Sequence, residues 1–307
     1  MFRIDEADCI SFLRELPDES VDLIVTDPAY SGMNRHLMLG RGRIVGFYRS
    51  AVSAQPQSSQ QEVSTNQAVR QVSDEPIGCQ AGCQKELTKR RNFLVKEKKW
   101  FTEFLDDPDA YRVFLGECRR VLRNNRHIYI MFDSFSLLSL GHVVREFFDV
   151  KNLLVWDKVN LGMGHYFRRR HEHIIFASKG CRKLRRRDLP DVWQIKRIKG
   201  VYPTQKPVEL FERMIEASAE PGFVVCDPFV GSGSSAVAAL RLGCHFVGAD
   251  ISSRAVALAR ERCSRFLETG VDPFEAGLPA VRIDRQEVLA NQHELIERQN
   301  FLQEVLA

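Results

Sequence analysis

Short apolar runs alternate with longer amphipathic stretches along most of this chain. Each run has the length of a buried strand and ends at a polar or turn-forming residue. The stretches between them repeat apolar residues at the spacing of a helix face. Strands that alternate with helices predict an α/β fold with a doubly wound, mainly parallel sheet. The predicted strands lie at 21–26, 127–133, 153–158, 173–179, 223–227 and 245–250, and the predicted helices at 100–123, 234–242 and 252–266.

Two regions break this alternation and set the domain boundaries. Residues 50–84 are rich in Gln and Ser and contain few large apolar residues, so they cannot bury enough surface to offset the entropy of ordering. Together with the basic stretch that follows, 50–99 is predicted to be a flexible polar and basic insertion. The domain that it interrupts comprises 1–49 and 100–280. Apolar residues then recur at every seventh position, which predicts a C-terminal helix over 281–307 that packs on its own domain.

The first predicted strand stops at the sequence Asp27-Pro28-Ala29-Tyr30. Proline has no N–H to donate to a ladder and restricts the residue before it, so the strand ends here. One interpretation is a strand followed by an ordinary turn. The other is a carboxylate and an aromatic ring held at the carboxyl edge of the sheet, where open α/β proteins bind their ligands.

A glycine loop, CDPFVGSGSS, follows the predicted strand at 223–227 and precedes a predicted helix. Gly231 and Gly233 would let the backbone approach a ligand closely, and the helix N-terminus offers free N–H groups. Asp250 ends the next strand, about twenty residues further on, where an acid binds ribose hydroxyls in Rossmann-type sites. The combination predicts a cofactor that contains a nucleoside.

The composition indicates a globular protein with a hydrophobic content of 44% and a net charge of +4. No apolar run approaches the ~18 residues of a membrane span, and acids stand where a signal peptide has basic residues, so we expect a cytoplasmic protein that does not enter a membrane. The eight cysteines are scattered, several inside apolar patterns, which predicts free thiols. Cys79 and Cys83 have no second pair, and His171 and His173 have no further ligand at metal spacing, so no metal site is expected.

Positive charge is concentrated between Lys151 and Lys206, where fifteen Lys and Arg residues stand against four acids, a net +11. Such a run is often a solvated face. In a chain whose total is only +4, a polyanionic partner explains it better. We expect this segment to reach over the carboxyl edge beside Asp27. The candidate contacts to this partner are Arg168, Arg169, Arg170, Arg185, Arg186, Arg187, Lys196 and Arg197.

Several motifs together resemble a known family. DPFVGSGSS, preceded by YPTQKPVELFERMIEAS and paired with the upstream DPAY, is similar to the motifs of S-adenosylmethionine-dependent DNA amino-methyltransferases, and the motif order resembles their permuted β class. These enzymes methylate the N6 of adenine or the N4 of cytosine. The family usually has a second proline where this chain has Ala29. The resemblance covers most of the chain outside 40–99 and the C-terminal tail.

The resemblance implies a seven-stranded sheet of the Rossmann-like methyltransferase type, S-adenosylmethionine as cofactor, and methylation of double-stranded DNA by base flipping. It implies that 160–204 contacts DNA and recognises the target. A homodimer is one candidate assembly. In the catalytic roles it places Asp27, Pro28 and Tyr30. In the cofactor-binding roles it places Asp8, Cys9, Asp27, Lys206, Asp227, Phe229, Gly231, Ser232, Gly233, Ser234 and Asp250.

Adenine is favoured over cytosine, because the DPxY sequence is commoner among adenine enzymes. An N4-cytosine enzyme is the first alternative. An RNA or protein-glutamine methyltransferase is the second, and Asp27, the motif order and the +11 segment argue against it. An inactive nucleic-acid-binding relative is the third, and the intact glycine loop with Asp250 argues against that.

Overall fold

The computed structural model describes residues 1–28, 107–162, 167–186, 188–198, 202 and 205–275. The insertion expected at 50–99 and the C-terminal helix expected at 281–307 lie outside these residues, as do Tyr30 and Arg187. Within the described part, none of the helices has the length and hydrophobicity that crossing a membrane requires.

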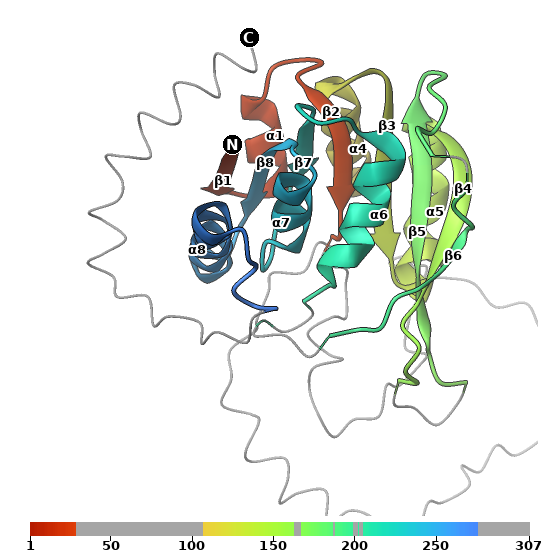
Figure 1. Cartoon of the computed structure of the whole chain (residues 1–307). Helices are drawn as coiled ribbons and strands as arrows, with labels where there is room; N and C mark the ends of the chain where they lie inside the picture. Colours follow the sequence, from red (N-terminus) through yellow and green to blue (C-terminus); the bar gives the residue numbers. More distant parts are fainter. Residues whose placement is uncertain (29–106, 163–166, 187, 199–201, 203–204, 276–307) are drawn as a thin grey trace, which may run out of the picture. The chain divides into compact units, whose positions relative to one another are not determined.

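One mixed sheet, described over eight strands, organises this part of the chain, in the order β1-β8-β7-β2-β3-β5-β4-β6 (Figure 1). Every neighbouring pair is parallel except those that β5 makes with β3 and β4. The strands are β1 (Phe2–Glu6), β2 (Val21–Thr26), β3 (Leu122–Phe132), β4 (Asp149–Asp157), β5 (His171–Lys179), β6 (Val192–Gln194), β7 (Val224–Asp227) and β8 (His245–Asp250).

Helices cover both faces of the sheet, as a doubly wound fold requires (Figure 1). Side chains of α6, α7 and α8 build one apolar core with the sheet, and side chains of α1, α4 and α5 build the other. Both faces of β2 are therefore buried, which explains why its sequence is continuously apolar except for Asp22 and Thr26. The helices are α1 (Cys9–Glu15), α4 (Pro108–Val121), α5 (Ser134–Phe147), α6 (Val208–Ser218), α7 (Ser234–Arg241) and α8 (Ser253–Thr269).

The predicted fold class is confirmed, and all six predicted strands are present. The expected count of seven strands is wrong, since the described sheet has eight. Two strands had not been located in the sequence. The chain's first strand, Phe2–Glu6, alternates charged with apolar residues, and Val192–Gln194 has only three residues, too few to show a period.

Candidate active site

Aspartates line the carboxyl edge of the sheet, at or just beyond the ends of five adjacent strands. Along the order β1, β8, β7, β2 and β3 these are Asp8, Asp250, Asp227, Asp27 and Asp133. Because the carboxyl ends of parallel strands share one edge, residues distant in sequence meet here. Four of the five accept hydrogen bonds from backbone N–H groups of the turn or helix that follows. Among the contacts that the structure describes, Asp27 accepts no such backbone hydrogen bond, and its partner is a lysine.

Asp27 forms an ion pair with Lys206, which lies just before α6. The side chain of Asp27 is 22% exposed and that of Lys206 only 11%. Burial raises the pKa of the Asp27 carboxyl, and the positive charge of Lys206 opposes this rise. Burial would lower the pKa of Lys206, but Asp27 and Glu172 outweigh it, so the net pKa is raised. The ammonium therefore keeps its charge beside a carboxyl group that is costly to ionise.

The pair continues into a chain of alternating charges. The Lys206 Nζ lies 3.8 Å from Oε2 of Glu172, which is the second residue of β5. The Lys158 Nζ, beyond the end of β4, donates to Oε1 of the same carboxylate at 2.7 Å. The family resemblance implies that Lys206 binds the cofactor, and in the structure its ammonium contacts Asp27.

The glycine loop connects β7 to α7 and lies against the end of β8. The N–H of Gly231 donates to Oδ2 of Asp250 at 2.9 Å, and the N–H of Ser252 donates to Oδ1 at 2.9 Å. Burial raises the pKa of Asp250. This aspartate thus holds the loop and the start of α8, and each of its oxygens retains a lone pair for another donor.

The structure explains the presence of the two glycines in the loop in different ways. Gly233 has a φ of +81°, and a Cβ there would lie 3.0 Å from the Cβ of Ala259 on α8. Gly231 also has a positive φ, +52°, but a Cβ there would only reach Tyr202 at 3.9 Å. Gly233 is therefore required by helix packing as well as by its backbone, which the sequence interpretation did not anticipate.

Asp227 and Phe229 support the loop from inside. Asp227 is 2% exposed and accepts from the Ser235 hydroxyl at 2.6 Å and from the Phe229 N–H at 3.0 Å. Burial raises the pKa of Asp227 to about 7. The Phe229 ring packs edge-on against Phe114 of α4, with ring centroids 5.6 Å apart. Both residues thus stabilise the fold at this place.

Asp8 and Cys9 lie at the start of α1. Asp8 is the N-cap, and its Oδ1 accepts from the N–H groups of Ile10 and Ser11 at 3.1 and 3.0 Å. The hydrogen bonds of Ser11 lower the pKa of Asp8. Cys9 is buried, and burial raises the pKa of its thiol to about 12. The backbone N–H of Ala7 donates to the carbonyl of Asp250 at 3.2 Å. Asp8 and Cys9 therefore lie beside the aspartate that holds the glycine loop.

A buried arginine that belongs to no motif of the sequence analysis also holds the loop. Arg262 of α8 is 1% exposed, and its guanidinium donates twice to Asp272, at 2.9 and 2.6 Å. Its Nη1 donates to the carbonyl of Ser232 at 3.0 Å and to the hydroxyl of Ser234 at 3.1 Å. The Ser234 hydroxyl in turn donates to the carbonyl of Lys206 at 2.8 Å. The glycine loop is therefore connected to the residue that pairs with Asp27.

Part of the basic segment lies at this same edge. Because β5 is antiparallel, residues 167–170 precede it beyond the ends of β3 and β4. Arg170 is fixed by two hydrogen bonds to Asp157, at 2.6 and 2.7 Å, while Arg169 lies over the Phe135 ring and Arg168 bonds the Gly162 carbonyl. Lys196 and Arg197 follow the end of β6 and are exposed.

The expectation that the cluster at 182–187 reaches over Asp27 is wrong for 182–186, the part of it that the structure describes. Strand β5 is antiparallel to β3 and β4 and runs toward their amino ends, with Lys179 opposite Arg126, and so delivers the chain to the far edge. There the N–H of Arg185 bonds the carbonyl of Ala217 at the end of α6. Arg186 pairs with Asp188 and Glu216. These arginines are tied to residues of the chain itself.

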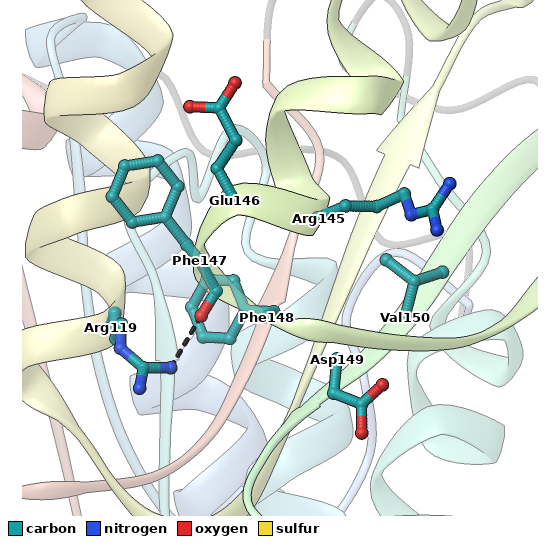
Figure 2. A pocket seen from close by; sticks show the side chains of 7 residues that line it. All are labelled: Arg119, Arg145, Glu146, Phe147, Phe148, Asp149 and Val150. Carbon is teal, nitrogen blue, oxygen red and sulfur yellow. Dashed lines mark hydrogen bonds between the residues drawn. The ribbon is translucent and has the colours of Figure 1, made fainter.

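A surface hollow also lies at the far edge, where α5 ends and β4 begins (Figure 2). Arg119 of α4 donates to the carbonyl of Phe147 at 2.6 Å across this hollow, and the charged groups around it have both signs. It lies opposite the row of aspartates and has no part in the candidate site. Its lining consists of Arg119, Arg145, Glu146, Phe147, Phe148, Asp149 and Val150.

The histidines of β5 pack on each other rather than forming a metal cluster. The rings of His171 and His173 lie edge to face, with centroids 4.9 Å apart. Among the described residues, no group of three or more His, Cys, Asp or Glu side chains could hold a metal ion. Cys118, Cys226 and Cys244 are buried and free, as predicted, whereas Cys79 and Cys83 lie outside the described part.

Comparison with known proteins finds a family whose matched region includes the residues of the carboxyl edge. A family model described as DNA methylase, for N6 and N4 methyltransferases, matches residues 21–261, which include both Asp27 and the glycine loop. The chain belongs to the DNA methylase family. Members of this family methylate exocyclic amino groups of DNA bases, so this DNA methylase is an enzyme that acts on DNA.

Individual relatives of the DNA methylase have low sequence identity to it, but the similarity covers most of each chain. It is 25% identical to the type II methyltransferase M2.DpnII of Streptococcus pneumoniae, over 86% of this chain and 90% of that one. It is 24% identical to the type II methyltransferase M.HinfI of Haemophilus influenzae, over 84% of this chain and 67% of that one. Among solved structures, a putative DNA modification methylase of Thermus thermophilus superposes with a TM-score of 0.52 at 19% identity, covering 88% of this chain and 97% of that one. The cytosine-N4-specific PvuII methyltransferase superposes with a TM-score of 0.54 at 14% identity, covering 88% of each chain.

Proposed function

We propose that this DNA methylase transfers a methyl group to the exocyclic N6 of adenine in duplex DNA, with Asp27 as the residue that receives the amino group. The observation that carries the proposal is the position of Asp27. It follows a buried strand at the carboxyl edge of the sheet and pairs with a lysine, whereas the neighbouring Asp227 and Asp250 accept backbone hydrogen bonds.

The chemistry of an aromatic amine explains this arrangement. The lone pair of the adenine amino group is delocalised into the ring, so the nitrogen is a poor nucleophile. The Asp27 carboxylate accepts one N–H of the amine, and the Pro28 carbonyl accepts the other. These contacts favour a pyramidal nitrogen and balance the positive charge that develops on it. The methyl donor would keep the electron pair of the methyl–sulfur bond as the new N–C bond forms, and the methylated nitrogen would lose its proton to water.

S-adenosylmethionine is the methyl donor of this family and supplies an electrophilic methyl group on a sulfonium. The residues at the edge fit such a molecule. Asp250 keeps lone pairs for the ribose hydroxyls beside the backbone of the glycine loop. Asp8 has an oxygen besides the one that caps α1, which can accept the amino group of the cofactor's adenine. Further positions proposed for cofactor binding are Cys9, Asp227, Phe229, Gly231, Ser232, Gly233 and Ser234.

Duplex DNA is held, in this proposal, by the basic residues of the carboxyl edge. Arg168, Arg169 and Arg170 precede β5, and Lys196 and Arg197 follow β6, all on the side of the sheet where Asp27 lies. Their charges suit phosphate oxygens. Those parts of 160–204 that lie at this edge are proposed to recognise the target, within a catalytic domain formed by 1–49 and 100–280. Tyr30 is the proposed stacking partner of the flipped base.

The acceptor is tested by labelled methyl transfer. Purified protein is incubated with S-adenosylmethionine labelled in the methyl group and, separately, with duplex DNA, RNA and a protein mixture. We expect label in duplex DNA only, and none with Asp27→Ala protein. Label in RNA or protein instead would contradict the proposal, and duplex binding without any transfer would identify an inactive relative.

A further inference from the structure

Glu172 lies within reach of the Asp27 pair, although it belongs to a different strand and is not among the candidate site residues that the sequence predicts. It is the second residue of β5, and its side chain is 26% exposed. Its two oxygens face two different lysines, Lys158 at 2.7 Å and Lys206 at 3.8 Å. Lys206 therefore has a carboxylate on each side, Asp27 and Glu172.

This geometry bears on a conflict at the proposed site. If Asp27 receives the amino group of the base, its negative charge must balance the charge that develops on that nitrogen. A lysine that pairs fully with Asp27 cancels the same charge before the reaction begins. In the low-dielectric surroundings of a buried pair, this loss is larger than it would be in water. A second acceptor for the lysine would relieve it.

We propose that Glu172 is a positioning residue that draws the Lys206 ammonium away from Asp27 when the base enters. This inference rests on the proposed function. Lys206 then stays ion-paired throughout, since its Nζ already lies within ion-pair distance of both carboxylates. Lys158 holds the other oxygen of Glu172 and so fixes the orientation of the carboxylate. In this proposal Glu172 acts through Lys206 and not by contact with the base or the cofactor.

The charged groups around this cluster define its response to pH. Burial, the largest cause, raises the pKa of Asp27, and the negative charge of Glu172 acts in the same direction. Burial lowers the pKa of His173, the histidine next to Glu172, which favours its neutral form at neutral pH. Within the described part of the chain, the charged or titratable groups that act on Asp27, Lys206 and Glu172 include Lys158, His173 and Asp227.

The test uses Glu172→Gln in the full chain, with single-turnover methyl transfer measured from pH 5 to 9 at saturating DNA and S-adenosylmethionine. We expect the rate to fall about tenfold or more while binding of both substrates stays within a few-fold. The acid limb of the pH profile should move to lower pH, because Asp27 loses a negative neighbour that raises its pKa. Glu172→Asp keeps the charge and should recover part of the rate. Glu146→Gln removes an exposed carboxylate paired with Arg112 at the far edge and is the matched control.

An unchanged rate and acid limb in Glu172→Gln would overturn the inference. So would equal losses in the Gln and Asp variants together with a lower Tm, which would indicate a structural role. A second measurement is independent of activity. The pKa of Lys206, followed by NMR of ¹³C-dimethylated protein, should fall in Glu172→Gln, because the charge of Glu172 helps to raise it. If wild-type protein methylated no DNA, the proposed function would fail, while an unchanged Lys206 pKa would refute the placement of Glu172.

Discussion

Asp22 and Asp27 lie at opposite ends of β2 and show how one strand can carry a structural and a chemical carboxylate. Asp22, at the amino edge, is 3% exposed and accepts from Arg123, Arg126 and the N–H of Val224, at 3.0 to 3.3 Å. Asp27, at the carboxyl edge, pairs with Lys206, which Glu172 shares. Both are partly or wholly removed from water, but only Asp22 is surrounded by several donors in the described structure.

Further residues of the two edges show a similar difference. At the amino edge, arginines are held by acids and carbonyls of the same chain, as Arg186 is by Asp188 and Glu216. At the carboxyl edge, burial raises the pKa of Asp27, Asp227 and Asp250. A buried carboxyl with a raised pKa and few donors is costly to maintain for stability alone, and such groups gather at functional sites.

The largest expected effect is on catalysis at Asp27. Asp27→Ala should lower the rate of methyl transfer by about a thousandfold or more, the range expected when a group that stabilises developing charge is removed. Affinity for S-adenosylmethionine, measured by calorimetry, should stay within a few-fold. Near-normal activity in this variant would refute the catalytic assignment.

Asp22→Ala should show the opposite behaviour. Removing this carboxylate leaves Arg126 and the N–H of Val224 without their buried acceptor. We expect the free energy of unfolding to fall by about 2–3 kcal/mol, less than for a fully buried pair because Arg123 keeps contact with water. Urea unfolding measures this, with methyl transfer by the remaining folded protein as the control. If the variant lost methyl transfer without any loss of unfolding free energy, the proposed difference between the two ends of β2 would be wrong.

Asp250→Ala tests the cofactor end of the carboxyl edge. The variant loses an acceptor for the proposed ribose hydroxyls and the hydrogen bonds from the N–H groups of Gly231 and Ser252. Affinity for S-adenosylmethionine should weaken by roughly 1–3 kcal/mol. Calorimetry is the measurement. Asp133→Ala, which removes a helix cap at the same edge, is the control and should leave this affinity unchanged.

The smallest expected effect is on the salt dependence of DNA binding. It is tested by comparing the basic residues of the two edges. Replacing Arg168, Lys196 and Arg197 with alanine should flatten the dependence of log K for duplex DNA on log salt by roughly two to three units, about 0.9 for each phosphate that is no longer neutralised. The same change at Arg182, Arg185 and Arg186 should leave that slope unaltered, since these side chains bond to α6 and the residues around it. A flatter slope in the second variant only would place DNA at the amino edge.

The sequence was most informative where a motif coincides with the end of a strand. Asp27 and Asp250 were located correctly because a strand that stops at an acid must present it at the carboxyl edge. The fold class followed from the alternation of strands and helices. These inferences need only local pattern and the rules of parallel sheets.

Contacts between distant segments could not be located in that way. Lys206 and Asp27 are 179 residues apart, and Arg262 meets the glycine loop from another helix. The position of 182–187 depended on the direction of β5, which a run of apolar residues does not encode. Glu172 had a local signal, an acid at the start of an apolar strand, but its importance comes from the lysines of other elements.

The identity of the methylated base tests the central claim most directly. Duplex DNA treated with the protein and S-adenosylmethionine is digested to nucleosides and analysed by mass spectrometry, with protein carrying Asp27→Ala in parallel. We predict N6-methyldeoxyadenosine with the wild-type protein and none with the variant. N4-methyldeoxycytidine in its place, or equal amounts of N6-methyldeoxyadenosine from both proteins, would contradict the account.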